Sequence, residues 1–472
     1  MDRIEVKEQK PVERAKNFKE VCLGYTLDEA KKEASRCLKC KNPMCVKSCP
    51  VAIDIPSFIS KVEEGKIEEA YEIIQQNSSL PAICGRVCPQ ETQCEGSCVK
   101  RFKSDAIAIG KLERFVADWV RENKKENKLH IEKNNIKIAI VGSGPAGLTC
   151  AGELAKKGFD VTIFEALHKP GGVLTYGIPE FRLPKEEVVN NEIENLKKLG
   201  VKIECNVVIG KTLTIEQLQE EYEAIFIATG AGLPRFMNIP GENANGVFSA
   251  NEYLTRINLM KAFKEQDTPV YTSKKVAVIG GGNVAMDAAR TALRLGNEVY
   301  IVYRRDENEM PARKEEVHHA KEEGIKFKVL SNPIEVLVDE ANCVKGLKCI
   351  EMELGEPDDS GRRRPVPKKD SEFEIEVDTV IMALGTSPNP IILSNTKDIQ
   401  TNKYGCIVID EEFGSTSKEG IFAGGDITSG AATVILAMEA GKKAAVGIEE
   451  YIKNRKKWYW KKISICYNFL YK

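Results

Sequence analysis

The chain has 472 residues, which is too long for one ordinary hydrophobic core and predicts two to four domains. Its 69 lysines and arginines nearly balance its 70 aspartates and glutamates, so no overall charge draws it to nucleic acid or to an anionic membrane. There is no run of about 18 apolar residues, and the charged N-terminus lacks the apolar stretch of a signal peptide. We therefore expect a soluble, cytoplasmic protein with no membrane span and no nucleic acid partner.

Eight of the fifteen cysteines lie close together near the N-terminus. In a reducing compartment such crowding indicates metal or redox chemistry rather than structural disulfides. The first run, RCLKCKNPMCVKSCP, is similar to a ferredoxin run, although its four-residue gap departs from the two-residue gap of the bacterial pattern. The two runs contain Cys37, Cys40, Cys45 and Cys49, then Cys84, Cys88, Cys94 and Cys98.

Thiolates at these spacings can bind iron or zinc. Structural zinc usually takes two tight cysteine pairs rather than two runs of four, so the spacing favours iron–sulfur clusters. Residues 1–130 also carry stretches of helical period and almost no strand-length β-branched runs, which predicts a small α-helical domain around the metal. The polar run RENKKENKLHIEKNN predicts a boundary near residue 130.

The pattern then changes to an apolar strand, a glycine turn, a helix and a second strand: KIAIVGSGPAGLTCAGELAKKG and DVTIFEA. Such a turn lets the backbone approach a pyrophosphate at the helix N-terminus, and Glu165 ends the second strand, where it can accept from ribose hydroxyls. The alternative is a tight turn with a chance acidic residue. We expect a dinucleotide in residues 131–250, bound by Gly142, Ser143, Gly144, Pro145, Ala146, Gly147 and Glu165.

A second unit of the same kind, KKVAVIGGGNVAMDAARTALRLG and EVYIVYRR, lies in residues 251–380. Its second strand ends in Arg304 and Arg305 instead of an acidic residue. Two guanidinium groups can bind a 2′-phosphate through charge-assisted hydrogen bonds, which predicts NADP(H). A solvated basic strand end is the alternative. The predicted binding residues are Gly280, Gly281, Gly282, Asn283, Val284, Arg304 and Arg305.

The last block, GIFAGGDITSGAATVILAMEAGKKAA, predicts a strand, a turn and a helix in residues 381–452. The simplest topology inserts the second dinucleotide unit into the first, giving an α/β protein with a helical domain followed by two doubly wound units. Two different nucleotide sites in one chain imply transfer between a tightly held flavin and an exchangeable nicotinamide. We assign no catalytic acid or base, and no function to the basic, aromatic tail 453–472.

The motifs together resemble one family. CxxCxxxxCxxxCP, CGRVCPQxxxCEGxC, VGSGPAGL, GGVLTYGIPEFRLPK, GGGNVAMDAAR, YRR and AGGD are similar to those of the small (beta) subunit of NADPH-dependent glutamate synthase. That family includes the large subunit of NADH-dependent ferredoxin:NADP oxidoreductase, and the N-terminal half of dihydropyrimidine dehydrogenase is a more distant match. The resemblance extends from Cys37 to about Tyr451.

The resemblance implies an FAD and two [4Fe–4S] clusters with interleaved ligands, and it leaves Cys84 out of both. The implied ligands are Cys37, Cys40, Cys45 and Cys98 for one cluster, and Cys49, Cys88, Cys94 and Glu113 for the other. It also implies flavin contacts from Gly171, Gly172 and Arg182, a contact of Asp426, after Gly425, with the ribityl or phosphate end, and Thr433 at the next helix start.

The function implied is electron input from NADPH through FAD to the clusters for L-glutamate formation from glutamine and 2-oxoglutarate. No (β/α)8 pattern appears and no cysteine stands at position 2, so we expect the glutamine chemistry in a separate large subunit. Two alternatives remain. One is flavin-based transhydrogenation with a small ferredoxin-reductase-like flavoprotein, with ferredoxin as a further partner, and the other is a zinc-stabilised nucleotide-sensing scaffold without turnover.

Overall fold

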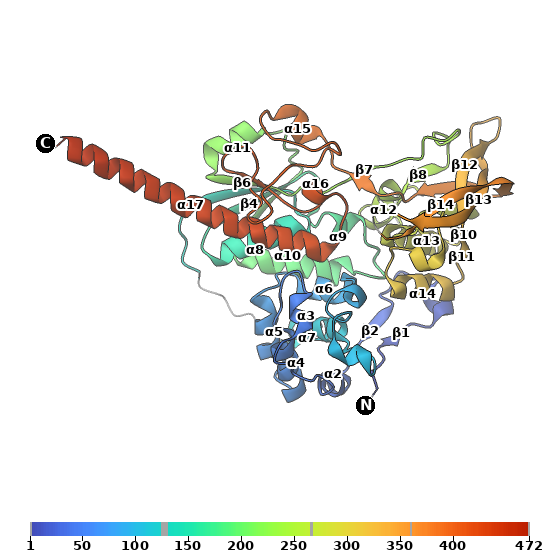
Figure 1. Ribbon diagram of the computed structural model, residues 1–472, viewed down its shortest axis with the longest axis horizontal. Coiled ribbons are helices and arrows are strands. Elements are labelled where there is room, and N and C mark those ends of the chain that lie inside the picture. The colour runs from blue at the N-terminus through green and yellow to red at the C-terminus, as the bar shows by residue number, and fades with distance from the viewer. Residues whose placement is uncertain (1, 124–130, 265–267, 359–360, 471–472) are drawn as a thin grey trace.

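The computed structural model describes residues 2–123, 131–264, 268–358 and 361–470, and from residue 456 onward its backbone alone. A helical N-terminal part lies on one side of the molecule, and two sheet-containing parts lie together on the other (Figure 1). This arrangement confirms the predicted α/β fold class, a helical domain followed by two doubly wound units. The boundary predicted near residue 130 adjoins 124–130, which lie outside the described residues.

The N-terminal part is built from short helices whose ends the sequence specifies. Thr26 and Glu29 form a capping box at the start of α2, Asp54 caps α4, and Gly65 ends α4 in the left-handed conformation. Apolar faces pack into a core that includes Phe58 and Leu112. The elements are β1 (Lys7–Glu8), α1 (Pro11–Arg14), β2 (Cys22–Gly24), α2 (Leu27–Ala34), α3 (Met44–Lys47), α4 (Ile55–Glu64), α5 (Ile67–Gln75), α6 (Pro81–Val87), η1 (Gln90–Thr92), η2 (Val99–Phe102) and α7 (Ile109–Asn123).

The first parallel sheet has the strand order β17-β6-β3-β4-β5. In its central strand, β3, the four residues after Lys137 are apolar and buried, as expected when helices cover both faces of the sheet. The elements are β3 (Lys137–Val141), α8 (Pro145–Lys156), β4 (Asp160–Glu165), α9 (Val173–Tyr176), η3 (Lys185–Val189), α10 (Asn190–Lys198), β5 (Lys202–Cys205), α11 (Ile215–Glu221), β6 (Ala224–Ile227), α15 (Ile391–Asn395) and β17 (Ile421–Ala423).

The second parallel sheet has the strand order β11-β10-β9-β15-β8, and the chain enters and leaves it through two antiparallel segments, β7 (Leu233–Pro234) and β16 (Thr386–Ser387). This pairing is the one expected of an inserted unit. Strand β8 belongs with the second sheet because it pairs with β15, although the division at residue 250 placed it with the first unit. The elements are β8 (Val247–Ser249), α12 (Ala250–Asn258), β9 (Lys275–Ile279), α13 (Asn283–Arg294), β10 (Glu298–Val302), η4 (Glu307–Glu309), α14 (Lys314–Glu322), β11 (Lys326–Lys328) and β15 (Thr379–Met382).

A three-stranded antiparallel sheet extends the second unit. It consists of β12 (Ser331–Val338), β13 (Val344–Pro357) and β14 (Arg363–Ile375). The segment before β12 bonds to the end of β10: Ser331 N donates to Tyr303 O at 3.0 Å, and Leu330 N donates to Arg305 O at 3.0 Å. The antiparallel sheet therefore begins beside the two arginines predicted to bind the nucleotide, and the β13–β14 hairpin contacts Arg305 through Arg363 and Asp358.

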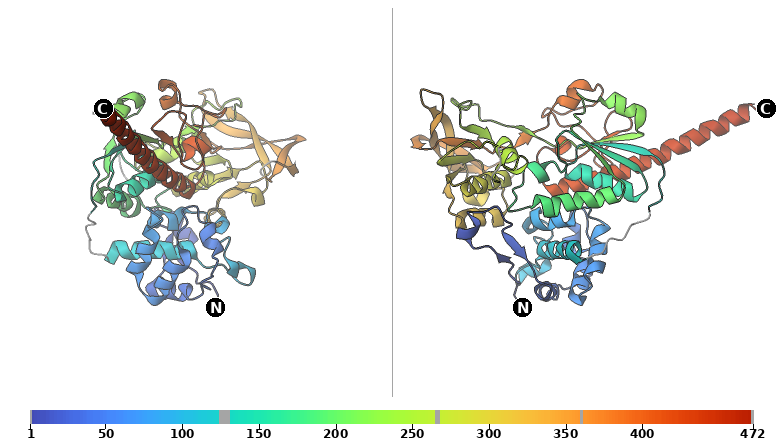
Figure 2. Two further views of the ribbon diagram at one scale, coloured as in Figure 1. Left: turned by 60° about the vertical axis from the view of Figure 1, so that its left-hand side comes forward. Right: turned by 180° about the vertical axis from the view of Figure 1, so that it is seen from behind.

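The chain closes with α16 (Asp426–Ser429) and the long helix α17 (Val434–Leu470). A side chain at Gly441 would clash with the backbone of Ala146, so glycine lets α17 lie directly on α8. Beyond that contact α17 leaves the body of the protein (Figure 2). The predicted tail 453–472 is therefore helical as far as Leu470, and 471–472 lie outside the described residues. Among the described helices, none has the length and apolar character needed to cross a bilayer.

Candidate functional site

The first glycine turn joins β3 to α8. Gly142 has a φ of +101°, and a side chain at Gly147 would clash with the carbonyl of Gly142. A Cβ at Gly144 would meet no atom within 4 Å, so the space in front of the turn is open. Pro145 and Ala146 form the buried first turn of α8. This is the geometry that lets a phosphate reach the unpaired N–H groups of a helix N-terminus.

Glu165 fixes this turn from the neighbouring strand. Its carboxylate is buried and accepts from Ser143 N at 3.0 Å and from Leu167 N at 2.8 Å, and it also bonds to the Ser143 hydroxyl. Gly171 N donates to Ser143 Oγ at 2.9 Å. Both Ser143 donors bond to Oε2 and Leu167 N bonds to Oε1, so one lone pair of Oε1 remains for the predicted acceptance from a ribose.

A second glycine turn packs directly against the first. Gly172 has a φ of +54°, and a Cβ there would lie 2.9 Å from Gly144 Cα. Tyr176 follows in α9, and burial first, then the charges of Asp426 and Glu165, raise its pKa to about 12. The structure thus brings these predicted flavin contacts together around one space.

The Gly425–Asp426 turn lies on another side of that space. Gly425 has a φ of +78°, and a Cβ there would lie 3.1 Å from that of Ala146. Burial raises the pKa of Asp426 to about 6, and its carboxylate accepts from Ala432 N at 3.2 Å. Thr433 Oγ1 accepts from Leu436 N at 3.4 Å at the start of α17. The N-termini of α16 and α17 therefore both lie near the glycine turn between β3 and α8.

The second dinucleotide turn joins β9 to α13. Gly280 has a φ of +141°, a Cβ at Gly281 would lie 2.7 Å from the Tyr303 ring, and Gly282 faces open space. Asn283 Oδ1 accepts from Arg313 N at 2.9 Å, and Val284 is exposed. The turn is held in place by residues from the end of β10 and from the loop before α14.

The two predicted phosphate-binding arginines differ in their surroundings. Arg304 is exposed and makes no hydrogen bond or ion pair to the rest of the described chain. Arg305 is buried: its Nη2 donates to Asp358 Oδ2 at 2.6 Å and its Nε donates to Arg363 O at 2.8 Å. The β13–β14 hairpin thus orients the Arg305 guanidinium, and no described residue holds that of Arg304.

Arg182, predicted to line the flavin, lies between the two dinucleotide units. Its Nη1 is 2.7 Å from both carboxylate oxygens of Asp287, and its Nε is 2.8 Å from Glu316 Oε1. Burial lowers the pKa of Arg182, but Asp287 and Glu316 outweigh it and raise the pKa. The contact of Arg182 with a flavin remains a prediction; the structure shows it joining the first unit to α13 and α14.

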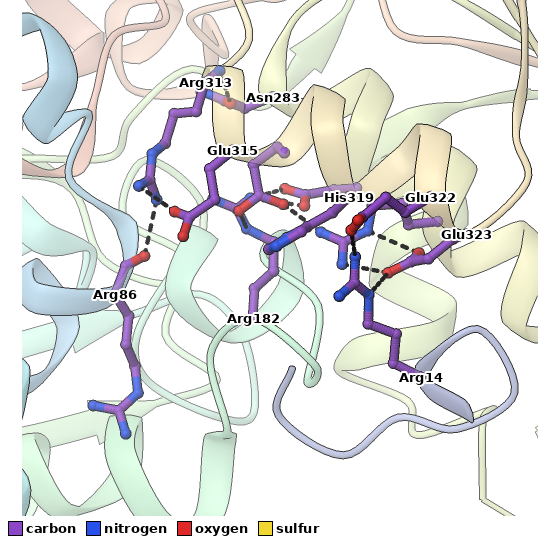
Figure 3. Close-up of polar contacts among 12 residues, drawn as sticks. Arg14, Arg86, Arg182, Asn283, Arg313, Glu315, His319, Glu322 and Glu323 are labelled. Carbon is purple, nitrogen blue, oxygen red and sulfur yellow. Dashed lines mark hydrogen bonds and ion pairs between the residues drawn. The ribbon is translucent and has the colours of Figure 1, made fainter. Parts of the chain in front are cut away.

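A buried ion-pair junction around α14, the α14 junction, connects all three parts of the chain (Figure 3). Glu323 accepts from Arg14 of the N-terminal part at 3.0 Å and from Arg290 and Arg294 of α13 at 2.7 Å each. Arg313 donates to Arg86 O at 3.1 Å. This junction has no signal in the sequence, because the run RKEEVHHAKEE has the composition of a solvated helix face.

The first predicted set of cluster ligands converges on one cavity. Cys37, Cys40, Cys45 and Cys98 all line it, together with Ile55, Ile59 and Ile109 among others. Burial and the nearby charge of Cys98 raise the pKa of Cys45 to about 11. Four free thiols around a small, mostly apolar cavity are a donor set that fits an iron–sulfur cluster.

The second set converges around a buried carboxylate. Glu113 Oε1 is buried without a hydrogen-bond partner among the described residues, and burial raises the pKa of Glu113 to about 8. Burial and, among the neighbouring charges, Glu113 raise the pKa of Cys49 and of Cys94. Cys88 lies close enough to Glu113, Cys94 and Cys49 for their charges to act on its thiol. A buried carboxylate without a partner beside three thiols fits the predicted second cluster.

Cys84 lies beside this group but has other partners. It is buried, and its Sγ is 3.4 Å from Met438 Sδ and 3.9 Å from Ser78 Oγ. These contacts agree with the ligand set that leaves Cys84 out. That assignment remains a prediction.

Comparisons with known proteins fit this geometry. Residues 14–125 match the family of dihydropyrimidine dehydrogenase domain II with a 4Fe–4S cluster, and residues 136–441 match the pyridine nucleotide-disulphide oxidoreductase family. A glutamate synthase [NADPH] small chain of Halomonas elongata is 38% identical over 462 residues, covering 94% of this chain and 96% of that protein. The chain belongs to the glutamate synthase small-chain family.

Other relatives of the family differ in what their names describe. The NADP(+)-dependent formate dehydrogenase subunit beta of Moorella thermoacetica is 40% identical over 434 residues, covering 87% of this chain and 60% of that one. The structure of Mycobacterium tuberculosis FprA in complex with NADPH is 21% identical with a TM-score of 0.58, covers 69% of this chain and 86% of that chain, and shows the shared fold. The chain is thus a pyridine nucleotide-dependent iron–sulfur flavoprotein oxidoreductase of the glutamate synthase small-chain family, whose relatives are subunits of larger enzymes.

Proposed function

We propose that the chain is the electron-input subunit of an NADPH-dependent glutamate synthase, with one FAD and two [4Fe–4S] clusters. A partner subunit would form L-glutamate from glutamine and 2-oxoglutarate. The observation that carries this proposal is the match to a glutamate synthase small chain over nearly the full length of both proteins. The match to the formate dehydrogenase subunit covers 60% of that protein's length.

In this proposal the residues of the two dinucleotide turns bind and orient FAD and NADPH. The turn at Gly142 and Gly144 opens the N-terminus of α8 to the pyrophosphate of FAD, and Glu165 holds that turn rigid while it accepts from the ribose. The turn at Gly282 and Asn283 opens the N-terminus of α13 to the pyrophosphate of NADPH. Arg304 and Arg305 bind the 2′-phosphate of NADPH. Flavin supplies the exchange between two-electron and one-electron chemistry when it is bound.

The two sets of cysteines would hold the clusters through which electrons leave. Cys37, Cys40, Cys45 and Cys98 would hold one cluster, and Cys49, Cys88, Cys94 and Glu113 the other. The overall balance is two electrons and one proton from each NADPH, which becomes NADP+. Two one-electron acceptors are reduced, or one two-electron acceptor in the partner subunit.

The test is anaerobic purification followed by NADPH oxidation with three alternative acceptors: ferredoxin, NAD+, and glutamine plus 2-oxoglutarate with the copurifying partner. Copurification of a large amidotransferase-bearing subunit and glutamate formation would support the proposal. Recovery of a small ferredoxin-reductase-like flavoprotein, with ferredoxin-dependent NAD+ reduction, would replace it by the transhydrogenase. A colourless protein containing zinc would replace both by the nucleotide-sensing scaffold.

A further inference from the structure

The hairpin that holds Arg305 also places negative charge beside it. Arg305 is buried, and its Nη2 donates to Asp358 Oδ2 at 2.6 Å. Glu309 Oε2, from η4, lies 3.9 Å from Arg305 Nε, and this buried oxygen has no hydrogen-bond partner among the described residues. One guanidinium therefore lies between two carboxylates at the place where the 2′-phosphate of NADPH is expected.

The backbone at the end of the hairpin fixes the position of Asp358. Asp358 N donates to Arg362 O at 2.7 Å, and Asp358 Oδ1 accepts from Arg362 N at 3.3 Å. Gly361 N donates to Asp358 O at 2.8 Å, and Gly361 has a φ of +78°, which glycine adopts without strain. The turn itself therefore presents the Asp358 carboxylate to Arg305.

These contacts change the balance of charge at the expected 2′-phosphate site. The two arginines, Arg304 and Arg305, supply two positive charges. Asp358 and Glu309 supply two negative charges beside Arg305. A like charge within about 4–6 Å disfavours an anion, so the two carboxylates oppose a phosphate that Arg305 attracts. Arg304 is then the cation of the pair whose charge no described residue offsets.

We propose that Asp358 is a specificity-determining residue of the second dinucleotide unit, which narrows its preference for NADPH and lets NADH compete for the site. The Asp358 carboxylate offsets the charge of Arg305 and so reduces the advantage that a 2′-phosphate gives to NADPH. NADH supplies the same two electrons and one proton as NADPH and becomes NAD+. The inference rests on the proposed function, because it concerns the nucleotide that donates these electrons.

Two probes without a nicotinamide test the site by binding alone. Adenosine 2′,5′-bisphosphate and AMP differ only in the 2′-phosphate, and calorimetry with the loaded protein gives a dissociation constant for each. Asp358→Asn keeps an oxygen for Arg305 but removes the charge, so the ratio of the AMP constant to the bisphosphate constant should rise about tenfold. The preference for NADPH over NADH in kcat/KM should rise with it. Glu309→Gln should raise the ratio less, because Glu309 lies farther from Arg305.

Two further variants separate the lost charge from a disturbed hairpin. Asp370→Asn makes the same change at an exposed position of β14 and should leave the ratio at its wild-type value. Asp358→Ser also keeps an oxygen without the charge, so it should raise the ratio too, and it serves if the asparagine variant folds poorly. The melting temperature of each variant without nucleotide shows whether the hairpin is intact.

The outcomes are distinct. An unchanged or lower ratio in a folded Asp358 variant would overturn the proposal, since Asp358 would then only orient Arg305. An equal rise in Asp370→Asn would also overturn it, because the effect would come from net charge. A wild-type protein that binds the bisphosphate but oxidises neither NADPH nor NADH would instead refute the proposed function, while the ratio would still report on Asp358.

Discussion

At the scale of single residues, nucleotide choice depends on two adjacent arginines in different surroundings. Arg304 is exposed and has no partner among the described residues, so its guanidinium is available for a ligand. A charge-assisted hydrogen bond contributes about 1.5–3 kcal/mol. We therefore expect Arg304→Ala to raise the KM for NADPH at least about tenfold and to leave the KM for NADH nearly unchanged. Steady-state kinetics with both nucleotides measures this directly.

Arg305 has a structural role in addition. Asp358 and Arg363 use two of its five N–H groups, so three remain for a phosphate. Arg305→Ala should raise the KM for NADPH and also lower the melting temperature, because the hairpin loses its anchor. Asp370→Asn, an exposed change in the same hairpin, should alter neither quantity. Equal increases in KM for NADPH and NADH would contradict the assignment to the 2′-phosphate.

Glu192 gives a pH-dependent prediction. Its carboxylate is buried in α10 and accepts from Ala82 N at 2.7 Å at the start of α6, and burial raises its pKa to about 7. A folded-state pKa above the unfolded value contributes stability at low pH that is lost as the pH rises from about 4.5 to 7. Glu192→Gln keeps the acceptor but cannot ionise, so its melting temperature should fall less than that of the wild type between pH 5 and pH 7.5.

The control for this prediction is Glu187→Gln, a change of the same kind at an exposed position of η3. It should reproduce the wild-type dependence on pH. Parallel pH profiles for Glu192→Gln and the wild type, measured by differential scanning calorimetry of the loaded protein, would show that Glu192 does not limit stability in this range.

At the scale of elements, the α14 junction determines how the second dinucleotide unit sits on the rest of the protein. Glu323 is buried among three guanidinium groups, those of Arg14, Arg290 and Arg294. Removing one partner of a buried ion pair leaves uncompensated charge and costs about 3–5 kcal/mol. Glu323→Gln should therefore lower the melting temperature strongly. Glu322→Gln, which removes only a half-exposed partner of Arg14, should lower it much less.

Proteolysis separates loss of this junction from general unfolding. If α14 holds the N-terminal segment, Glu323→Gln should increase cleavage around Lys16 and Lys19 before any other site. Cleavage spread evenly along the chain, or equal melting temperatures for the two variants, would show that the junction does not anchor the segment.

The elements themselves could be predicted from sequence because their signals are local. The turns at Gly142 and Gly280 follow apolar strands and begin helices, and both are present with positive φ. The α14 junction could not be predicted, since Arg14 and Glu323 lie 309 residues apart. The same holds for the pairing of Arg305 with Asp358. Where a charged side chain is buried, its partner depends on packing rather than on neighbouring residues.

At the scale of the whole molecule, the cysteine spacing alone could not divide eight thiols into two sites. The structure brings Cys37, Cys40, Cys45 and Cys98 to one cavity and places Glu113 beside the others. Glu113 had no signal of its own, because a glutamate in a helix is ordinary. The resemblance to a family supplied it as a candidate, and its buried oxygen, which has no hydrogen-bond partner in the described part of the chain, gives that candidate a physical basis.

The number of electrons the protein can store tests this division as a whole. One FAD and two [4Fe–4S] clusters hold about four electrons and about eight iron atoms, so anaerobic titration without an acceptor should consume about two NADPH per chain. Cys45→Ser should reduce the iron content to about half and remove one electron of capacity, and Glu113→Ala should affect only the other cluster. Cys205→Ser, a thiol at the end of β5, should leave both values unchanged. About four iron atoms in the wild type, or loss of all iron from Cys45→Ser, would show that the two sets of ligands do not hold separate clusters.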